Sequence, residues 1–449
     1  MVGPRSLPPK GALLTLEERV QEVLRRRLSA TRRVDVGPGA VRRLPEAIEA
    51  LGLPNEVLAI AQPRTWEAAS AALQAAAEAG GMRVSVHVTF AEAATHEACE
   101  RLGDEIRRQP SLLPVAVGAG PVNDLVKLGA QDAGVPYVCV ATAASMNGYP
   151  SSIGAVLRDG LKCTVPATPP VLIIGDTDLL STAPSELTGS GYADLLAKPC
   201  SVADWILARE VAGEGFEEEP LRIMDGVVEA VVAAADGIAA LNPASVESLM
   251  LGLTLSGLSM AAAGTSQPAS GAEHLISHSW DMLGHRDSWR LDLHGRQVGV
   301  ACIMISALWE RLLSLEEHDL TAALGQDADA LRYDVIACYG DLAGRCLSQF
   351  SRKSASHSAV AAHVGRARGK WADLRDALRA IVVSPARMRD ELAAGGAPTT
   401  LAEIGRSPDD ARLALRWARV LRNRYTCLDL AAEAGHLGGW IDELVAEVC

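Results

Sequence analysis

The stretch that decides the fold is residues 113–142, LPVAVGAGPVNDLVKLGAQDAGVPYVCVAT. It opens with the apolar run 113–118, passes through a glycine-containing turn into a segment with apolar residues at helical spacing, and closes with a second apolar run at 136–142. Two short apolar runs joined by a helix are typical of a βαβ unit, in which the two strands lie parallel. This stretch therefore predicts a strand, a helix and a second strand.

The same alternation extends to both sides of this unit. Short apolar, β-branched runs alternate with alanine-rich helical patterns, which favours a parallel sheet covered by helices. Two later runs, SIGAVLR and LKCTVPA, are separated by Asp159 and Gly160 and predict a β-hairpin. The remaining predicted strands lie at 34–37, 56–61, 82–88 and 169–176.

Strand signals stop near residue 182, and nearly every later segment carries apolar residues at helical spacing. The predicted fold is therefore a Rossmann-like α/β half with a parallel sheet, followed by an all-α half. We predict an N-terminal extension at 1–33, a dinucleotide-binding α/β domain at 34–182, and an all-helical metal- and substrate-binding domain at 183–449.

Composition limits the possible partners. The chain has 449 residues, 49% of them hydrophobic, which is enough to bury full-sized cores. Its net charge of −13 and isoelectric point near 5.3 argue against a general surface for nucleic acid or anionic membranes. A phosphate-binding site would have to be a local basic pocket. We expect a small-molecule substrate and no nucleic acid.

Cysteine usage and hydropathy indicate the compartment. The nine cysteines are odd in number, scattered along the chain, and include no CxxC pair, which fits a reducing cytoplasm better than a disulfide framework. The longest apolar region, residues 249–263, is interrupted by Thr, Ser and Gly. We therefore predict a cytoplasmic protein without membrane insertion.

The turn after the first quoted strand has the features of a phosphate-binding loop. Glycines let the backbone approach a pyrophosphate, and the following helix offers free N–H groups and the positive end of its dipole. A tight strand-to-helix turn without a ligand is the alternative, because the third glycine of the usual fingerprint is missing and Asp124 could simply cap the helix. The candidate cofactor-binding residues here are Gly118, Ala119, Gly120, Pro121 and Asp124.

The end of the next strand supports the same site. Thr142 and Ser145 follow that strand, so their hydroxyls would face the crevice outside the carboxyl ends of the parallel strands. Thr and Ser are also common turn formers, which makes this support partial. Both residues are added to the cofactor-binding candidates.

Residues 268–300, PASGAEHLISHSWDMLGHRDSWRLDLHGRQVGV, contain His274, His278 and His294 in a chain with ten histidines. His274 and His278 are four residues apart and would share one helix face. Asp194, in GSGYADLLAK after a predicted Gly-Ser-Gly turn, could add a carboxylate to this cluster. Satisfied core histidines and a structural zinc site are the alternatives. Three ligands with an open position favour a catalytic metal.

Six blocks occur in an order that resembles the sn-glycerol-1-phosphate dehydrogenases, most closely their bacterial branch. This family belongs to the superfamily that also holds glycerol dehydrogenase, iron-containing alcohol dehydrogenases and dehydroquinate synthase. The resemblance runs from about Val34 to the C-terminus. The blocks are AVGAGPVNDLVK, ATAASMNGYPSS, GYADLLAK followed by ADW, PASGAEHLISH, LHGRQVGV and RNRYTCLDLA.

The resemblance implies roles for these residues and a dehydroquinate synthase-like fold. Asp194, His274 and His294 correspond to ligands of one divalent metal ion, which we expect to be zinc, with nickel and iron as alternatives because an Asp with two His suits all three. His278 would lie on the substrate side and could relay the alcohol proton. The glycine loop, Thr142 and Ser145 would bind NAD or NADP. Relatives form homo-oligomers, and we expect a homodimer.

Three positions depart from the family pattern. Asn147 stands where relatives often carry Asp, so an amide that can also donate replaces a carboxylate near the substrate. Arg296 adds a cation close to the metal ligands, although it could face solvent. No acidic residue ends the strand at 56–61, where it would mark NAD preference, and Arg64 could tolerate a 2′-phosphate. The choice between NAD and NADP stays open.

Three functions are compatible with these residues. We favour a metal-dependent NAD(P)H oxidoreductase that interconverts dihydroxyacetone phosphate and sn-glycerol 1-phosphate, or a related phosphorylated polyol and ketose. The alternative is a carbocycle-forming lyase of the dehydroquinate synthase type, with bound NAD and metal. A catalytically silent relative is the third, against which the intact candidate ligands argue.

Overall fold

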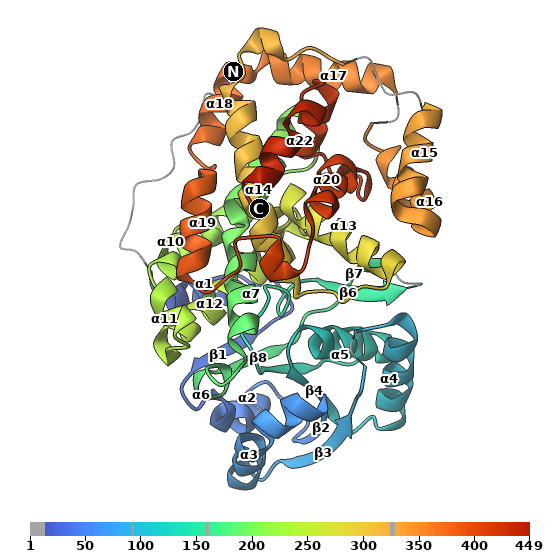
Figure 1. Cartoon of the computed structure of the whole chain (residues 1–449). Helices are drawn as coiled ribbons and strands as arrows, with labels where there is room; N and C mark the ends of the chain where they lie inside the picture. Colours follow the sequence, from blue (N-terminus) through green and yellow to red (C-terminus); the bar gives the residue numbers. More distant parts are fainter. Residues whose placement is uncertain (1–13, 92, 159–160, 324–327, 355) are drawn as a thin grey trace.

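The computed structural model describes residues 14–449 except 92, 159–160, 324–327 and 355. A six-stranded sheet in the order β1-β8-β5-β4-β2-β3 forms the lower part of the molecule in Figure 1. Every neighbouring pair is parallel, which confirms the predicted parallel sheet. Its strands are β1 (Arg33–Gly37), β2 (Glu56–Ala61), β3 (Arg83–Val88), β4 (Leu113–Gly118), β5 (Val138–Ala141) and β8 (Leu172–Asp176).

Helices cover both faces of this sheet, because its central strands are apolar on both faces. Val57 and Ala59 of β2 belong to one hydrophobic cluster, while Leu58 and Ile60 belong to the cluster on the other face. The first cluster packs under α2 (Leu44–Ala50) and α3 (Pro63–Gly80), and the second under α4 (His96–Arg108) and α5 (Gly120–Ala133). This is the burial pattern expected of parallel strands.

The predicted β-hairpin is also confirmed. Strands β6 (Ile153–Arg158) and β7 (Leu161–Pro166) pair antiparallel, with Gly154 opposite Val165. The turn predicted at Asp159 and Gly160 lies outside the described residues. In Figure 1 the hairpin lies between the sheet and the helical part of the chain.

After β8 the described residues form helices and loops, as predicted. The helices are α6 (Thr177–Leu180), α7 (Ser185–Leu196), α8 (Lys198–Leu207), α9 (Glu219–Met224), α10 (Val227–Val232), α11 (Ala235–Ala239), α12 (Pro243–Ala263), α13 (Ala272–Asp287), α14 (His294–Ser314), α15 (Ala328–Tyr339), α16 (Ala343–Phe350), α17 (His357–Gly369), α18 (Trp371–Arg379), α19 (Pro385–Ala394), α20 (Pro408–Trp417), α21 (Cys427–Glu433) and α22 (Leu437–Ala446).

Helices α12 and α14 are long and apolar enough to cross a membrane by length and composition alone. In the folded chain 72% of the apolar window of α12 and 83% of that of α14 is buried against other elements. Helix α14 packs against α7, α13 and α19. Both helices are therefore core helices of the fold.

Hydrophobic contacts continue across both predicted domain boundaries. Helix α1 (Leu16–Arg25), from the predicted N-terminal extension, packs against α12. One hydrophobic cluster includes Val20, Leu58 of the sheet and Val448 near the end of the chain. The division at residues 33 and 182 stays a prediction.

The turn predicted at Gly189, Ser190 and Gly191 is wrong, because these residues lie inside α7. The glycines serve a close approach of backbones. A Cβ atom on Gly191 would lie 2.0 Å from the carbonyl oxygen of Ala144, and one on Gly189 would lie 2.7 Å from that of Gly396. Helix α7 can therefore lie directly against the loop that follows β5.

A buried lysine fixes that loop from its other side. Lys127 of α5 donates to the carbonyl oxygens of Gly148 at 2.8 Å, Ser151 at 3.1 Å and Ile153 at 3.0 Å. Its side chain has no solvent exposure, and burial lowers the pKa of Lys127 to about 8. The ammonium thus donates hydrogen bonds to carbonyl groups of the loop that leads into β6.

Lys198, the first residue of α8, is buried in a different way. It is 3% exposed, and its Nζ has no hydrogen-bond partner. Burial lowers the pKa of Lys198 to about 8, against the opposing influence of Asp194 and Glu273. Lys127 therefore donates several hydrogen bonds, whereas Lys198 donates none to the described residues.

Replacing Gly191 by alanine is expected to lower the free energy of unfolding by about 1–3 kcal/mol, because the added methyl group overpacks α7 against the loop. Gly365 is the matched control, since it lies inside α17 and a Cβ there would meet nothing within 4 Å. Gly365→Ala should raise the free energy of unfolding by about 0.5–1 kcal/mol. Urea unfolding of both variants measures the contrast. Equal effects would contradict the close approach.

Lys127→Met should lower the free energy of unfolding by about 3 kcal/mol, because it leaves three buried or partly buried carbonyls without a charged donor. Lys198→Met removes a buried charge without removing a hydrogen bond, so its unfolding free energy should stay within about 1 kcal/mol of the wild type. Urea unfolding of the two variants at pH 7 tests this difference. A larger loss in Lys198→Met than in Lys127→Met would refute it.

Candidate functional site

A cleft of about 1360 Å³ lies between the sheet and the helical half. One wall contains the start of α5 and the β6–β7 hairpin, and the other contains α13, the first residue of α14 and residues 422–424. Most of the predicted cofactor, metal and substrate residues line this one cleft. They are Ala119, Gly120, Pro121, Asp124, Ser145, Asn147, Asp194, His274, His278 and His294.

Two of the predicted cofactor residues do not line the cleft. Thr142 is 8% exposed, and its backbone N–H donates to the carbonyl of Gly118. A Cβ atom on Gly118 would lie 2.6 Å from the side chain of Val122. Gly118 therefore permits the tight turn from β4 into α5.

The capping alternative for Asp124 is wrong. The N-cap of α5 is Ala119, and Asp124 lies within the helix and lines the cleft. Because Ala119 has no side-chain oxygen, no side chain at the N-cap competes for the first N–H groups of α5. Gly120 and Pro121 form the first turn, with Gly120 on the cleft wall. The start of α5 thus has the character of an anion-binding helix terminus.

Three helices bring the candidate metal ligands together. Asp194 comes from α7, His274 from the first turn of α13, and His294 from the first position of α14. One ligand atom from each lies within 4.8 Å of the others. Oδ1 of Asp194 is 3.3 Å from Nε2 of His274, and the rings of His274 and His294 are 5.1 Å apart.

The hydrogen bonds around these side chains fit a metal site. Oδ2 of Asp194 accepts the backbone N–H of Asn147 at 3.0 Å, whereas its buried Oδ1 lies against Nε2 of His274. Nδ1 of His274 lies 2.7 Å from Glu273, and Nδ1 of His294 lies 3.0 Å from the hydroxyl of Ser277. Such contacts through Nδ1 orient metal-binding imidazoles. The residues present therefore fit a divalent cation.

The charges of this group are strongly coupled. Burial acts to raise the pKa of Asp194, but the imidazoles of His274 and His294 outweigh it and hold that pKa below its usual value. Burial acts to lower the pKa of His274, but the carboxylates of Asp194 and Glu273 raise it. A metal ion binding here would compete with the imidazole proton.

A second trio shares one of these histidines. Ligand atoms of His278, Asp281 and His294 also lie within 4.8 Å of one another. These three are less buried than Asp194 and His274, and Asp281 accepts from Nε2 of Gln297 at 3.1 Å. The rings of His278 and His294 are stacked, with centroids 5.3 Å apart. His278 therefore lies beside the first trio and faces the cleft.

The three departures from the family pattern lie in different places. Asn147 lines the cleft, and its buried Nδ2 has no hydrogen-bond partner. Arg296 forms an ion pair with Asp292 at 2.9 Å and donates to the carbonyl of Glu403; Asp292 lines the cleft, but Arg296 does not. Arg64 is exposed at the start of α3 and does not line the cleft. Of the three, only Asn147 faces the site.

The sequence analysis missed the carboxylates behind the histidines. Glu273 has no solvent exposure and accepts the N–H of Gly271 in addition to contacting His274. Asp204 of α8 accepts the backbone N–H groups of Ala272 and Cys427. Glu273 had a signal, because an acidic residue directly precedes a candidate ligand, and Asp204 lies in the ADW block that carries part of the family resemblance.

Comparison with known proteins identifies relatives of this chain. A model for iron-containing alcohol dehydrogenase matches residues 35–184. The glycerol-1-phosphate dehydrogenase [NAD(P)+] of Haloarcula marismortui is 30% identical over 88% of this chain and 92% of its own length. The protein of the same name from Bacillus velezensis is 29% identical over 84% of this chain and 86% of its own length.

A solved structure supports the fold independently. A probable glycerol dehydrogenase from Sinorhizobium meliloti superposes with a TM-score of 0.62 over 93% of this chain and 98% of its own, at 15% identity. At that identity the likeness concerns the fold alone. The extent and identity of the sequence matches go further: this chain belongs to the glycerol-1-phosphate dehydrogenase family.

Proposed function

We propose that this protein is a metal-dependent NAD(P)H oxidoreductase that interconverts dihydroxyacetone phosphate and sn-glycerol 1-phosphate. One observation carries the proposal: Asp194, His274 and His294 converge on the same cleft that receives the start of α5. The names of the relatives from H. marismortui and B. velezensis support this substrate pair.

Asp194, His274 and His294 are proposed to hold the metal ion. A divalent cation bound there would supply Lewis-acid stabilisation of negative charge on the oxygen of the reacting carbon. Glu273 orients His274 through Nδ1, and Ser277 orients His294 in the same way. We propose zinc, with nickel and iron as alternatives, since all three suit one Asp and two His.

The start of α5 is proposed to bind the cofactor phosphates. Ala119, Gly120 and Pro121 line the cleft at the N-terminus of a 14-residue helix, where the helix dipole favours an anion. Ser145 and Asp124 lie on the same wall. A bound nicotinamide would supply or accept the hydride. With Arg64 outside the cleft lining, no described residue here marks a choice between NAD and NADP.

Two cleft residues are proposed to act on the substrate itself. His278 lies beside His294 and lines the cleft, which suits an imidazole that relays the alcohol proton. Nδ2 of Asn147 is a buried donor without a partner, which suits recognition of a substrate hydroxyl or carbonyl oxygen. Neither residue belongs to the first trio, which is proposed to hold the metal ion.

We also propose that the protein acts as a cytoplasmic homodimer. Its edge strand β3 carries exposed apolar side chains, with Val86 42% and Val88 40% exposed, and Phe90 just beyond it is 80% exposed. An uncovered strand edge with apolar residues supports self-association. The lyase alternative gains no support from the relatives named above, which carry the dehydrogenase name.

The activity test uses purified protein loaded with zinc, nickel or iron. It should oxidise NADH or NADPH when given dihydroxyacetone phosphate, followed by the loss of nicotinamide absorbance. Treatment with a chelator should abolish the activity, and the active metal should restore it. Failure with every ketose phosphate would refute the proposal, and tightly retained NAD with no net absorbance change during turnover would favour the lyase.

Asp194→Asn should lose the metal ion, because it removes the carboxylate charge from the first trio. Asp281→Asn is the matched control, since the same change is made to the second trio, and it should retain the metal. Metal content after gel filtration, measured by elemental analysis, distinguishes the two. Loss of metal in Asp281→Asn alone would move the proposed site to the second trio.

Glu273→Gln should weaken metal affinity by about 10- to 100-fold, because it removes the carboxylate that orients His274 and makes it more basic. Competition with a fluorescent chelator measures the affinity directly, without an activity assay. Glu247→Gln serves as the control, because Glu247 is not part of either candidate metal trio. An unchanged affinity in Glu273→Gln would show that this contact does not tune the site.

A further inference from the structure

Residues 422–424 form part of the cleft wall opposite the β6–β7 hairpin. Arg422, Asn423 and Arg424 all line the cleft. A guanidinium nitrogen of Arg422 donates to the hydroxyl of Thr164 on β7 at 3.2 Å. This hydrogen bond joins the hairpin to the segment that leads into α21, so Arg422 lies where the two walls meet.

Arg424 reaches the same cleft from a more buried position. Its guanidinium donates to the hydroxyl of Ser266 at 2.7 Å and to the backbone carbonyl of Ser270. Ser270 precedes Gly271, the N-cap of α13, and His274 follows four residues after Ser270. Because an α-helix rises about 5.4 Å per turn, the guanidinium lies near the helix turn that carries a candidate metal ligand.

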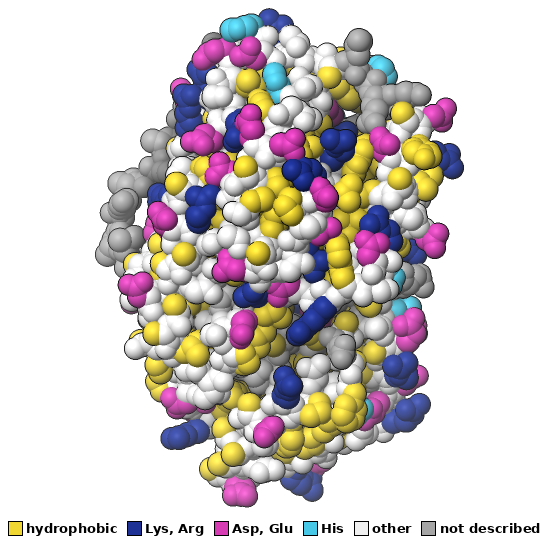
Figure 2. All heavy atoms as spheres, viewed as in Figure 1, with side chains coloured by type: hydrophobic (Ala, Val, Ile, Leu, Met, Phe, Trp, Pro, Cys, Tyr) yellow, Lys and Arg dark blue, Asp and Glu magenta, His cyan; other side chains and the backbone are white. Residues whose placement is uncertain are grey.

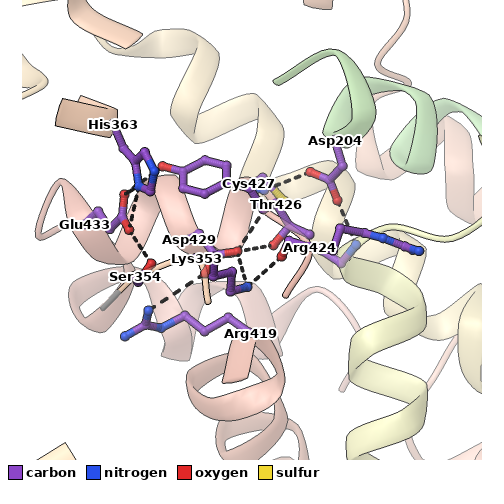
Figure 3. Close-up of polar contacts among 12 residues, drawn as sticks. Asp204, Lys353, Ser354, His363, Arg419, Arg424, Thr426, Cys427, Asp429 and Glu433 are labelled. Atoms are coloured by element: carbon purple, nitrogen blue, oxygen red, sulfur yellow. Dashed lines mark hydrogen bonds and ion pairs between the residues drawn. The ribbon is translucent and has the colours of Figure 1, made fainter. Parts of the chain in front are cut away.

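Neither arginine has a carboxylate partner among the described residues. The ion pairs found in that part of the chain include no carboxylate within 4.0 Å of Arg422 or Arg424. The neighbouring cation Lys353 is different, because it lies 2.8 Å from Asp429, which Arg419 also approaches at 3.8 Å. In Figure 3 the side chain of Arg424 extends away from Lys353 and Asp429.

The carboxylate of Glu214 acts on Arg424 electrostatically but makes its hydrogen bonds to other groups. Glu214 accepts the backbone N–H of Tyr425 at 2.7 Å and the side-chain amide of Gln267 at 2.5 Å. Burial lowers the pKa of Arg424 to about 10 and the charge of Arg422 adds to this effect, while the carboxylates of Glu214, Glu273 and Asp204 oppose it without outweighing it. Two guanidinium groups therefore lie close enough to repel each other in a partly desolvated cleft.

This pair is unusual in an acidic protein. The chain carries a net charge of −13, and Figure 2 shows acidic and basic side chains interspersed over the viewed face. A buried cation without a counter-ion costs free energy, and a bound anion would remove that cost. Arginine is also the side chain best suited to hold phosphate oxygens in two parallel hydrogen bonds.

We propose that Arg422 and Arg424 bind the phosphate group of the substrate. The inference rests on the proposed function and adds to it the residues that select a phosphorylated ketose over an unphosphorylated one. The phosphate lies against the guanidinium pair while the reacting carbon reaches toward His274. The start of α5, on the opposite wall, is left to the phosphates of the cofactor.

Kinetics with two ketoses test the proposal. Arg422→Gln should raise KM for dihydroxyacetone phosphate by about 10- to 100-fold, the effect of losing a hydrogen bond between two charged groups. KM for unphosphorylated dihydroxyacetone and KM for NADH or NADPH should not change. Arg424→Lys, which keeps the charge but not the fork of donors, should shift KM for the phosphorylated ketose in the same direction.

Two further variants sharpen this comparison. Arg101→Gln removes the same charge from an exposed position outside the cleft lining and should behave like the wild type. Arg352 lines the cleft but is exposed, so Arg352→Gln should have little effect. The proposal is overturned if Arg352→Gln alone raises KM for the phosphorylated ketose, or if Arg422→Gln raises KM only for the nucleotide.

Inorganic phosphate gives a test that does not depend on activity. Phosphate should raise the midpoint of thermal unfolding of the wild type and of Arg101→Gln, and this rise should be clearly smaller in Arg422→Gln. If the wild type reduces no ketose phosphate yet shows this pattern, the proposed function fails and the anion site stands. If the wild type is active but phosphate stabilises all variants equally, the anion site fails and the function stands.

Discussion

The hydrogen bond from the backbone N–H of Asn147 to Oδ2 of Asp194, 3.0 Å long, joins the two parts of the site. Asn147 belongs to the loop after the sheet strand β5, and Asp194 belongs to α7 of the helical half. The bond is possible because Gly191 lets α7 lie against the carbonyl of Ala144. With one oxygen fixed in this way, the other oxygen of Asp194 is directed toward His274.

A second carboxylate, that of Asp204, connects the candidate metal site with the arginine segment 422–424. Asp204 accepts the N–H of Ala272 at 2.7 Å, at the start of the helix that carries His274. It also accepts the N–H of Cys427 at 2.8 Å, three residues after Arg424, as Figure 3 shows. Burial raises the pKa of Asp204 to about 7. One buried side chain thus holds both the helix that carries His274 and the arginine segment in position.

Local patterns in the sequence predicted most of the fold, because each depends on neighbouring residues. The valine-rich runs gave the parallel strands, and the pattern around Asp159 and Gly160 gave the hairpin. Gly189 and Gly191 led to a wrong turn prediction, because glycine is common in turns. Here the space without a Cβ atom is needed for a distant backbone, that of Ala144 in the case of Gly191. The same limit applies to Asp204 and Arg424. Their partners lie 68 and 154 residues away in the chain, so only the folded structure reveals what they contact.

The cleft combines carboxylates around His274 with two arginines, and the proposed substrate carries a group for each. Asp194 and Glu273 surround His274 with negative charge, which a metal cation would balance. Arg422 and Arg424 provide positive charge near the same helix turn, and neither forms an ion pair with a carboxylate of the described residues. A short ketose phosphate carries an oxygen for the cation and a dianion for the arginines, and so balances both regions at once. A neutral polyol would leave the two guanidinium groups desolvated and unpaired, which is a physical reason for selecting the phosphorylated form.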